Sequence, residues 1–180
     1  MSGERSQMQA EAVPSLETLI GTYGNDVLRT AYLYVKDLHT AEDMFQEVFI
    51  KVNRCLSGFR GDSSVKTWLM RITINTCKDY LKSAYHRNVV PLMEFQENAL
   101  TSENDFDEIE RKETGKEIRE AVMMLPELYR DVVICVYFQN MSVAEAAAAL
   151  ELPEGTVKSR LSRAKEKLKE SLERRYGNEI

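Results

Sequence analysis

The sequence predicts an all-α protein: two small helical domains joined by a flexible acidic linker, with a helix-turn-helix in the C-terminal domain. Apolar residues recur at helical spacing along the 180-residue chain, and no segment alternates as a strand would. Two basic blocks, residues 51–90 and 156–180, are separated by residues 91–110, which hold seven acids and no base. We therefore expect a disordered N-terminus, a first domain, an acidic linker and a second domain, at residues 1–14, 15–88, 89–111 and 112–175.

Three helices are expected in the first domain. The first has an apolar stripe at spacings of three and four, formed by Leu16, Leu19, Ile20, Tyr23, Val27, Leu28, Ala31, Tyr34 and Val35. The hydroxyl of Thr40 is predicted to cap the second helix, because acidic residues follow it in the first turn. Two glycines and several small polar residues make residues 57–64 a loop. The third helix is expected to bury Val65, Trp68, Leu69, Ile72 and Leu81.

The second domain is predicted to contain a helix-turn-helix. Residues 132–138 are rich in β-branched and aromatic types, but Pro126 suits a helix start and Asn140 a helix end, so we interpret them as helix. Ser142 and Glu145 form a capping-box pattern before a short alanine-rich helix. Proline disfavours helix in the preceding residue, so this helix should break before Pro153. A basic helix is expected to restart at Thr156, which completes the motif.

Net charge alone argues against a nucleic-acid partner, because 24 Lys+Arg stand against 29 Asp+Glu, a formal charge of −5. The charge is uneven, however: residues 51–90 are net +6 and residues 156–180 net +4. The longest apolar run has seven residues, too few for a membrane span, and the N-terminus has neither a basic leader nor an apolar core. We expect a cytoplasmic protein without a signal peptide or stable membrane insertion.

The residue inventory argues against an enzyme or a metal site. Cys55, Cys77 and Cys135 are widely spaced and form no CxxC pair. His39 and His86 lie outside any HExxH motif, and neither a P-loop nor a GxGxxG motif is present. We therefore expect no catalytic residue, no metal and no cofactor.

The outer face of the last helix is a candidate surface for duplex DNA. With Val157 and Leu161 turned inward, the residues able to reach base edges in a major groove are Lys158, Ser159, Ser162 and Arg163. The flanking residues suited to phosphate contact are Thr156, Arg160 and Lys165. The alternative is an ordinary basic amphipathic helix that packs only on its own domain.

A second candidate surface, suited to single-stranded bases, lies around the third helix. One helix face carries Arg71, Asn75, Lys78 and Lys82. The loop before it and the first helical turn add Phe59, Arg60, Asp62, Ser63 and Trp68. An aromatic platform beside a charged groove is typical of single-strand binding. The alternative is that the two aromatic residues belong to the core.

Five blocks of the sequence, in family order, resemble bacterial extracytoplasmic-function (ECF) sigma factors of the sigma-70 family. They are similar to the polymerase-binding helix, the promoter-melting loop, the −10-reading helix and two parts of the −35-binding domain, at residues 41–52, 59–64, 67–75, 125–130 and 153–164. FRGDSS in the loop and PEGTVKSRLSRA in the last helix carry much of this resemblance. One departure is VAEAA at residues 143–147, where the family often has an aromatic and paired acids.

The resemblance implies roles for individual residues. On the polymerase-binding helix they are Asp43, Gln46, Glu47 and Phe49. For the melted −10 strand they are Phe59, Arg60, Asp62, Ser63, Asn75 and Lys78, and the candidate surface described above adds Trp68 and Arg71. For the −35 duplex they are Lys158, Ser159, Ser162 and Arg163, and the flanking residues described above add Thr156, Arg160 and Lys165.

The function that the resemblance implies is that of a non-catalytic initiation subunit. Such an alternative sigma factor binds core RNA polymerase, reads −35 duplex and opened −10 DNA, and is held inactive by an anti-sigma factor. Two other readings remain open from the residues alone: a one-component repressor with residues 1–90 as sensor, and a helical adaptor that binds only protein. We also hypothesise that the acidic linker screens both basic surfaces in the free protein.

Overall fold

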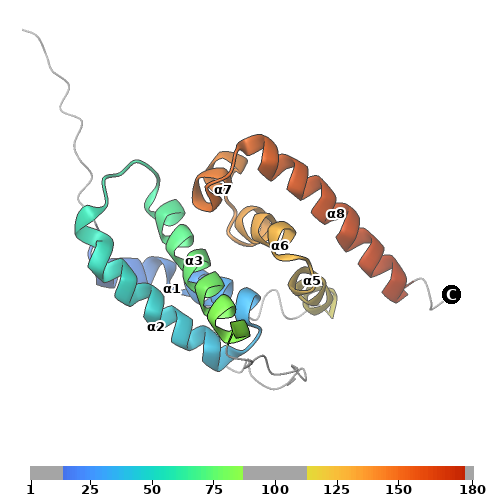
Figure 1. The fold of residues 1–180 in the computed structure, drawn as a ribbon, viewed down its shortest axis with the longest axis horizontal. Helices are drawn as coiled ribbons and strands as arrows, with labels where there is room; N and C mark the ends of the chain where they lie inside the picture. The colour runs from blue at the N-terminus through green and yellow to red at the C-terminus, as the bar shows by residue number, and fades with distance from the viewer. Residues whose placement is uncertain (1–13, 87–112, 177–180) are drawn as a thin grey trace, which may run out of the picture.

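The computed structural model describes residues 14–86 and 113–176, and the regular elements within these two ranges are all helical (Figure 1). The expected all-α class is therefore confirmed. The expectations about a disordered N-terminus and an acidic linker concern segments that lie outside the described residues.

The first domain is a bundle of three helices. They are α1 (Leu16–Val35), α2 (Leu38–Cys55) and α3 (Val65–His86), with a short 3-10 turn, η1 (Leu56–Gly58), after α2. Each helix packs against the other two. The fully or almost fully buried core is formed by Leu19, Val27, Ala31, Val48, Val52, Leu69, Met70 and Ile74. Val65, Trp68, Ile72 and Leu81 are half-buried and pack against it.

The start of α2 differs from the sequence prediction. The N-cap is Asp37 rather than Thr40, and the helix begins at Leu38. The carboxylate of Asp37 accepts hydrogen bonds from the backbone N–H of Thr40, at 2.8 Å, and from its hydroxyl, at 2.6 Å. Thr40 is therefore the third helical residue, because an ionised acceptor one turn earlier already satisfies the free backbone donors.

The second domain contains α5 (Glu113–Met123), α6 (Glu127–Val133), η2 (Ile134–Phe138), α7 (Val143–Leu150) and α8 (Glu154–Tyr176). The apolar run at 132–138 is helical, as expected, but its second part, η2, is a π-helix. Asn140 has the left-handed φ of 52° suited to ending a helix.

The helix-turn-helix is formed by α7 and α8. The capping box is present: the Glu145 N–H donates to the Ser142 hydroxyl at 3.2 Å, and the Ser142 N–H donates to the Glu145 carboxylate at 2.8 Å. Glu151 ends α7 with a left-handed φ of 54°. The next helix starts at Glu154, not at Thr156, because the Pro153 carbonyl already accepts from the backbone N–H of Thr156 at 2.9 Å.

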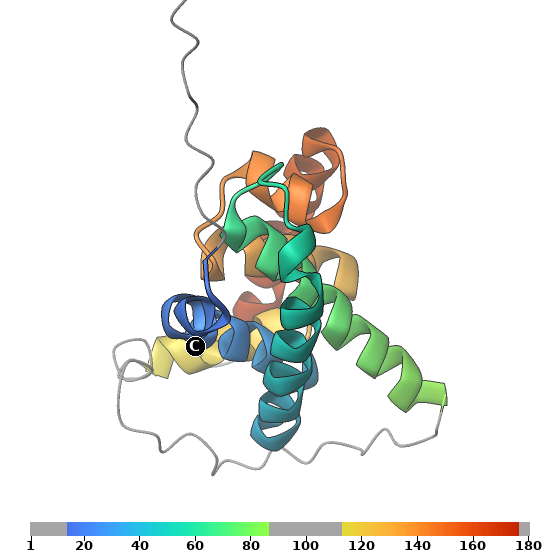
Figure 2. The same ribbon diagram turned by 90° about the vertical axis from the view of Figure 1, so that its left-hand side faces the viewer.

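The two domains pack against each other along a surface that we call the seam. In the seam, α7 lies against α3, and α5 and η2 lie against α1. Figure 1 shows the second domain beside the first, and Figure 2, seen from the side of the first domain, shows much of it behind the first. The seam brings together helices from opposite ends of the sequence, and it determines which candidate surfaces are open to a partner.

Candidate nucleic-acid and polymerase interfaces

The outer face of α8 is open to solvent. Lys158, Ser159, Ser162, Arg163 and Lys165 are exposed, whereas Thr156 and Arg160 are half-buried. The opposite face is anchored by the buried side chains of Val157, Leu161 and Ala164. This alternation holds four polar side chains outward within the first three turns of a helix, the geometry that fits a major groove.

Two residues near this face also make contacts within the domain. The Ser159 hydroxyl donates to the Thr156 carbonyl at 3.0 Å, which ties it to its own helix. The Lys165 ammonium lies 5.7 Å from the centre of the Tyr137 ring, within cation–π range. Lys158 and Arg163 are exposed cations on this face, within the first three turns of α8.

The loop between α2 and α3 presents an aromatic pair. The rings of Phe59 and Trp68 lie 5.0 Å apart at an interplanar angle of 50°, and both are half-buried. Arg60 and Asp62 are exposed beside them. Gly61 has a φ of 75°, a backbone conformation in which a side chain would be strained. The two rings pack on each other, and the pair retains some exposure to solvent.

The candidate face of α3 is divided by the seam. Asn75 and Lys82 are exposed, but Arg71 and Lys78 are half-buried against the second domain. One Arg71 nitrogen donates to the Ala148 carbonyl at 2.5 Å, and another lies 3.6 Å from the Glu151 carboxylate. Arg71 thus caps the C-terminal end of α7, where a cation is favoured.

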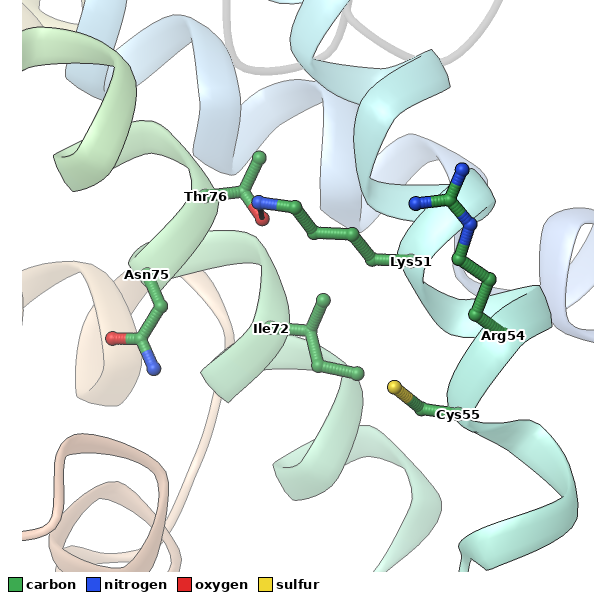
Figure 3. A pocket seen from close by; sticks show the side chains of 6 residues that line it. All are labelled: Lys51, Arg54, Cys55, Ile72, Asn75 and Thr76. Carbon is green, nitrogen blue, oxygen red and sulfur yellow. Dashed lines mark hydrogen bonds between the residues drawn. The ribbon is translucent and has the colours of Figure 1, made fainter. Parts of the chain in front are cut away.

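A shallow groove runs between α2 and α3 and has a volume of about 260 Å³ (Figure 3). It is lined by Lys51, Arg54, Cys55, Ile72, Asn75 and Thr76. The Lys51 ammonium donates to the Thr76 hydroxyl at 3.2 Å across it. Of these residues, sequence reasoning selected only Asn75 as a contact to DNA. Lys51 and Arg54 of α2 lie beside Asn75 in this groove because α2 packs against α3.

The predicted polymerase-binding residues lie at different depths on α2. Asp43 and Gln46 are exposed, and Glu47 is half-buried, 3.8 Å from the Lys51 ammonium. Phe49, in contrast, is only 5% exposed and packs on Phe45 with the ring centres 4.8 Å apart. Phe49 therefore supports the helix from inside, and Ile50, at 47% exposed, is the apolar side chain that α2 presents outward.

A buried carboxylate lies in the seam. Asp131 of α6 is 3% exposed and accepts a hydrogen bond of 2.5 Å from the Tyr34 hydroxyl of α1. It also forms an ion pair with the Lys78 ammonium, which contacts the Glu127 carboxylate at 3.2 Å as well. Both carboxylates belong to α6, so the second domain neutralises a cation of α3.

The pKa values of Tyr34 and Lys78 keep both groups in the protonation states that their contacts with Asp131 require. Burial, followed by the charge and hydrogen bond of Asp131, raises the pKa of Tyr34 well above its ordinary value, so the hydroxyl remains a donor. Burial disfavours the charged form of Lys78, but the bonds and charges of Asp131 and Glu127 outweigh burial. The pKa of Lys78 is therefore raised, and the ammonium remains charged.

A second polar contact crosses the seam at Gln139. Its side chain is 1% exposed, and its amide nitrogen donates to the Thr30 hydroxyl at 2.8 Å and to the Asp26 carbonyl at 3.2 Å. Both acceptors lie on α1. The seam is thus held by polar groups as well as by apolar packing.

The described residues offer no group of three metal-ligating side chains. Cys77 and Cys135 are buried, and burial raises the pKa of each thiol to about 12, whereas Cys55 is exposed. Within the described ranges, no helix is both long and apolar enough to span a bilayer.

Two family models match the chain in the order of its domains. Sigma-70 region 2 matches residues 19–87, and Sigma-70 region 4 matches residues 115–168. The RNA polymerase sigma-H factor of Pseudomonas aeruginosa is 32% identical, over 96% of each chain. The ECF RNA polymerase sigma-E factor of Haemophilus influenzae is 33% identical, over 86% of each chain. The chain belongs to the ECF RNA polymerase sigma factors.

Other relatives of this sigma factor agree. The ECF RNA polymerase sigma factor SigM of Mycobacterium tuberculosis is 32% identical over 86% of this chain and 75% of its own length. Solved structures share the fold. RpoE of Bartonella quintana, in complex with the anti-sigma factor NepR, has a TM-score of 0.68 at 22% identity, over 87% of this chain and 96% of its own. CnrH, in complex with the cytosolic domain of CnrY, has a TM-score of 0.65 at 22% identity, and the match covers 88% of this chain and 87% of CnrH.

Membership in this family decides between the readings that the residues left open. The protein is a sigma factor that binds core RNA polymerase and promoter DNA, rather than a repressor or a protein-only adaptor. In it, region 2 corresponds to the helices α1–α3 and region 4 to α5–α8. The roles of individual residues remain predictions.

Proposed function

We propose that this sigma factor holds the −35 duplex through the outer face of α8. The observation that carries this proposal is that Lys158, Ser159, Ser162 and Arg163 are exposed on a helix whose opposite face is buried. Lysine and arginine pair with guanine edges, and serine serves either base edges or phosphates. Half-buried Thr156 and Arg160, together with Lys165, suit the phosphates that flank the contacted bases.

Region 2 is proposed to hold the melted −10 strand. The Phe59–Trp68 pair offers a stacking surface, and the exposed Arg60, Asp62 and Asn75 offer hydrogen bonds to base edges. Ser63, Arg71 and Lys78 complete the predicted set. Arg71 and Lys78 act in this way only after they leave their partners in region 4.

The exposed part of α2 is proposed to dock on core polymerase. Asp43 and Gln46 supply polar contacts, and Glu47 adds a charge that Lys51 now neutralises. Phe49 contributes by keeping α2 packed on its own core.

The regulation and setting of the protein are also proposals. An anti-sigma factor is the proposed inhibitor, because the similar RpoE was solved with the anti-sigma factor NepR. The cytoplasm is the proposed compartment, where core polymerase and promoters are found. The protein is proposed to contribute no catalytic residue of its own.

Transcription with purified components tests this function. The full chain is added to core RNA polymerase with fragmented genomic DNA, and the 5′ ends of the transcripts are sequenced. We expect transcripts that start downstream of one shared pair of −35 and −10 sequence elements. We expect no such transcripts when the chain is left out. Equal transcription with and without the chain would contradict the proposal, as would duplex binding that blocks transcription.

A further inference from the structure

Tyr137 places an exposed aromatic ring beside the −35 helix. Its side chain is 51% exposed, whereas the other aromatic residues of α6 and η2, Tyr129 and Phe138, are half-buried. The centre of the Tyr137 ring lies 5.7 Å from the Lys165 ammonium of α8, within the range of a cation–π interaction. Tyr137 therefore contributes less to the core than a buried ring would, and on its outer side it contacts a cation of the −35 helix.

The π-helical turn of η2 gives Tyr137 this position. The Gln139 N–H donates to the Ile134 carbonyl at 2.9 Å, five residues earlier in the chain and one more than in an α-helix. Ile134, Cys135 and Gln139 are buried on the inner side of the turn, and Tyr137 lies between them in sequence but faces outward. The wider turn thus keeps the core contacts of η2 and leaves one aromatic ring for α8.

Lys165 belongs to a row of exposed side chains along one edge of α8. Lys158, Ser162 and Lys165 follow one another at spacings of four and three residues, so they share one side of the helix. Seven residues of α-helix span about 10.5 Å. Lys158 and Ser162 are proposed above to contact the −35 duplex. A row of donors of this length can follow the backbone of one DNA strand beside the groove that α8 enters.

An aromatic partner orders Lys165 without neutralising it. The Tyr137 ring carries no net charge, and an ammonium has three N–H donors, so donors remain for a phosphate while the cation stays over the ring. Lys169, in contrast, lies 3.7 Å from the Glu173 carboxylate, which a phosphate would have to displace. A long lysine side chain loses rotational freedom when it binds, and a ring that already restricts the side chain lowers this cost.

From these observations we propose that Tyr137 is a positioning residue for −35 binding. Its ring holds the Lys165 ammonium in line with Lys158 and Ser162, where the ammonium binds a phosphate of the DNA backbone. The inference rests on the proposed function of α8, and it adds a residue that lies outside the two helices of the helix-turn-helix. Tyr137 acts through Lys165 and not through a contact of its own with DNA.

The affinity of the full chain for duplex DNA at several salt concentrations tests this proposal. The probe is the fluorescent duplex carrying the −35 element found by transcript sequencing, followed by anisotropy. Lys165→Met removes the charge; we expect it to weaken binding about threefold to tenfold and to reduce the salt slope by about one phosphate contact. Tyr137→Leu removes the ring and leaves the charge; we expect it to weaken binding about twofold to fivefold.

A double-mutant cycle separates positioning from a purely structural role. In the Lys165→Met background, Tyr137→Leu should change the affinity by less than about 1.5-fold, because the ring acts through the ammonium. A ring that only supported the fold would weaken binding in both backgrounds. Tyr137→Phe keeps the ring and should restore the affinity of the wild-type chain, whereas a direct contact of the hydroxyl with DNA would be lost in this variant.

Lys167→Met is the matched control for charge. Lys167 is exposed on α8 and lies 5.7 Å from the Tyr129 ring, so it is also a lysine beside an aromatic ring. Two residues of helix turn it about 200° away from Lys165, to the other side of α8. We expect Lys167→Met to keep the salt slope of the wild-type chain. An equal loss of slope in both variants would mean that general charge, and not a phosphate site at Lys165, governs binding.

The outcomes distinguish this inference from the function on which it rests. If Lys165→Met weakens binding and Tyr137→Leu does not, or if Tyr137→Leu binds more tightly, the positioning role is wrong and the proposed function of α8 stands. If the wild-type chain does not bind the −35 duplex, the proposed function of α8 fails. Circular dichroism checks folding, and if Tyr137→Leu unfolds, Tyr137→Met, which also lacks a ring, takes its place.

Discussion

Asp131 of α6 and Lys78 of α3 form an ion pair across the seam, although the two residues lie 53 positions apart in the chain. The Asp131 side chain is 5% exposed and the Lys78 side chain is 21% exposed, so solvent and salt screen this pair only in part. Lys78, which the sequence analysis assigns to −10 DNA, therefore already has a carboxylate partner inside the protein. Whether a side chain can contact DNA therefore depends on its partners inside the protein as well as on its residue type.

Removing the Lys158 or the Arg163 side chain should weaken binding to the −35 duplex by about 1–3 kcal/mol each, as for loss of one base contact. Anisotropy with a duplex carrying the −35 element found by transcript sequencing measures this. Lys169→Ala is the matched control, because Lys169 lies further along α8 and pairs with Glu173 at 3.7 Å. Promoter selectivity that is unchanged in both variants would contradict the assignment.

Phe59→Ala should weaken opening of the −10 element while sparing the −35 contact. The substitution removes the ring that lies 5.0 Å from Trp68, and one stacked base contributes about 1–3 kcal/mol. Permanganate reactivity of unpaired thymines in the polymerase complex measures the opening. Tyr85→Ala, at an exposed aromatic residue near the end of α3, should open DNA normally. Normal opening in Phe59→Ala would remove the loop from the DNA-binding site.

The free energy of unfolding should fall in acid, because the carboxylates of two helix caps become protonated. Hydrogen bonds from Thr40 hold the pKa of Asp37 below its ordinary value of 3.8, and hydrogen bonds from Ser142 hold the pKa of Glu145 below 4.5. Both carboxylates are ionised more readily in the folded state. The stabilisation that they give the fold is therefore fully present above their ordinary pKa values, and it is lost as pH falls through their lower pKa values in the folded state. Thermal unfolding between neutral and acid pH measures this loss.

Ser142→Ala tests the second cap directly. It should cost about 1 kcal/mol at neutral pH and should reduce the acid sensitivity of unfolding in part, because the Glu145 carboxylate loses the Ser142 hydroxyl as a donor and keeps the backbone N–H. Ser57→Ala, at an exposed serine outside any cap, is the control and should leave unfolding unchanged. An equal loss of stability at every pH in Ser142→Ala would show that Glu145 is not coupled to the cap.

The three cysteines should react with a thiol reagent at very different rates. Burial raises the pKa of Cys77 and Cys135 to about 12, so few thiolates form there, whereas Cys55 is exposed in the groove of Figure 3. The native chain should show one fast thiol, which Cys55→Ser abolishes, and three after unfolding. Two or more fast thiols in the native chain would mean that a core opens readily.

Local sequence patterns predicted most of the secondary structure. The capping box at Ser142, the helix end at Asn140 and the break before Pro153 depend on residues within one turn, and all three are confirmed. The cap of α2 was placed wrongly at Thr40 because two candidate acceptors lie within one turn of each other. The better acceptor, the Asp37 carboxylate, takes both donors of Thr40. The predicted domain boundaries remain predictions.

By itself the sequence determined the helical class and the exposed face of α8, because apolar spacing and helix signals act over a few residues, and its motifs indicated the family by resemblance. Only the tertiary structure decided that Phe49 is buried, that Lys51 and Arg54 share a groove with Asn75, and that Asp131 is the partner of Lys78. These depend on how helices cross and how domains meet. Periodicity places Arg71 and Lys78 on one helix face, but the seam determines which groups these two side chains contact.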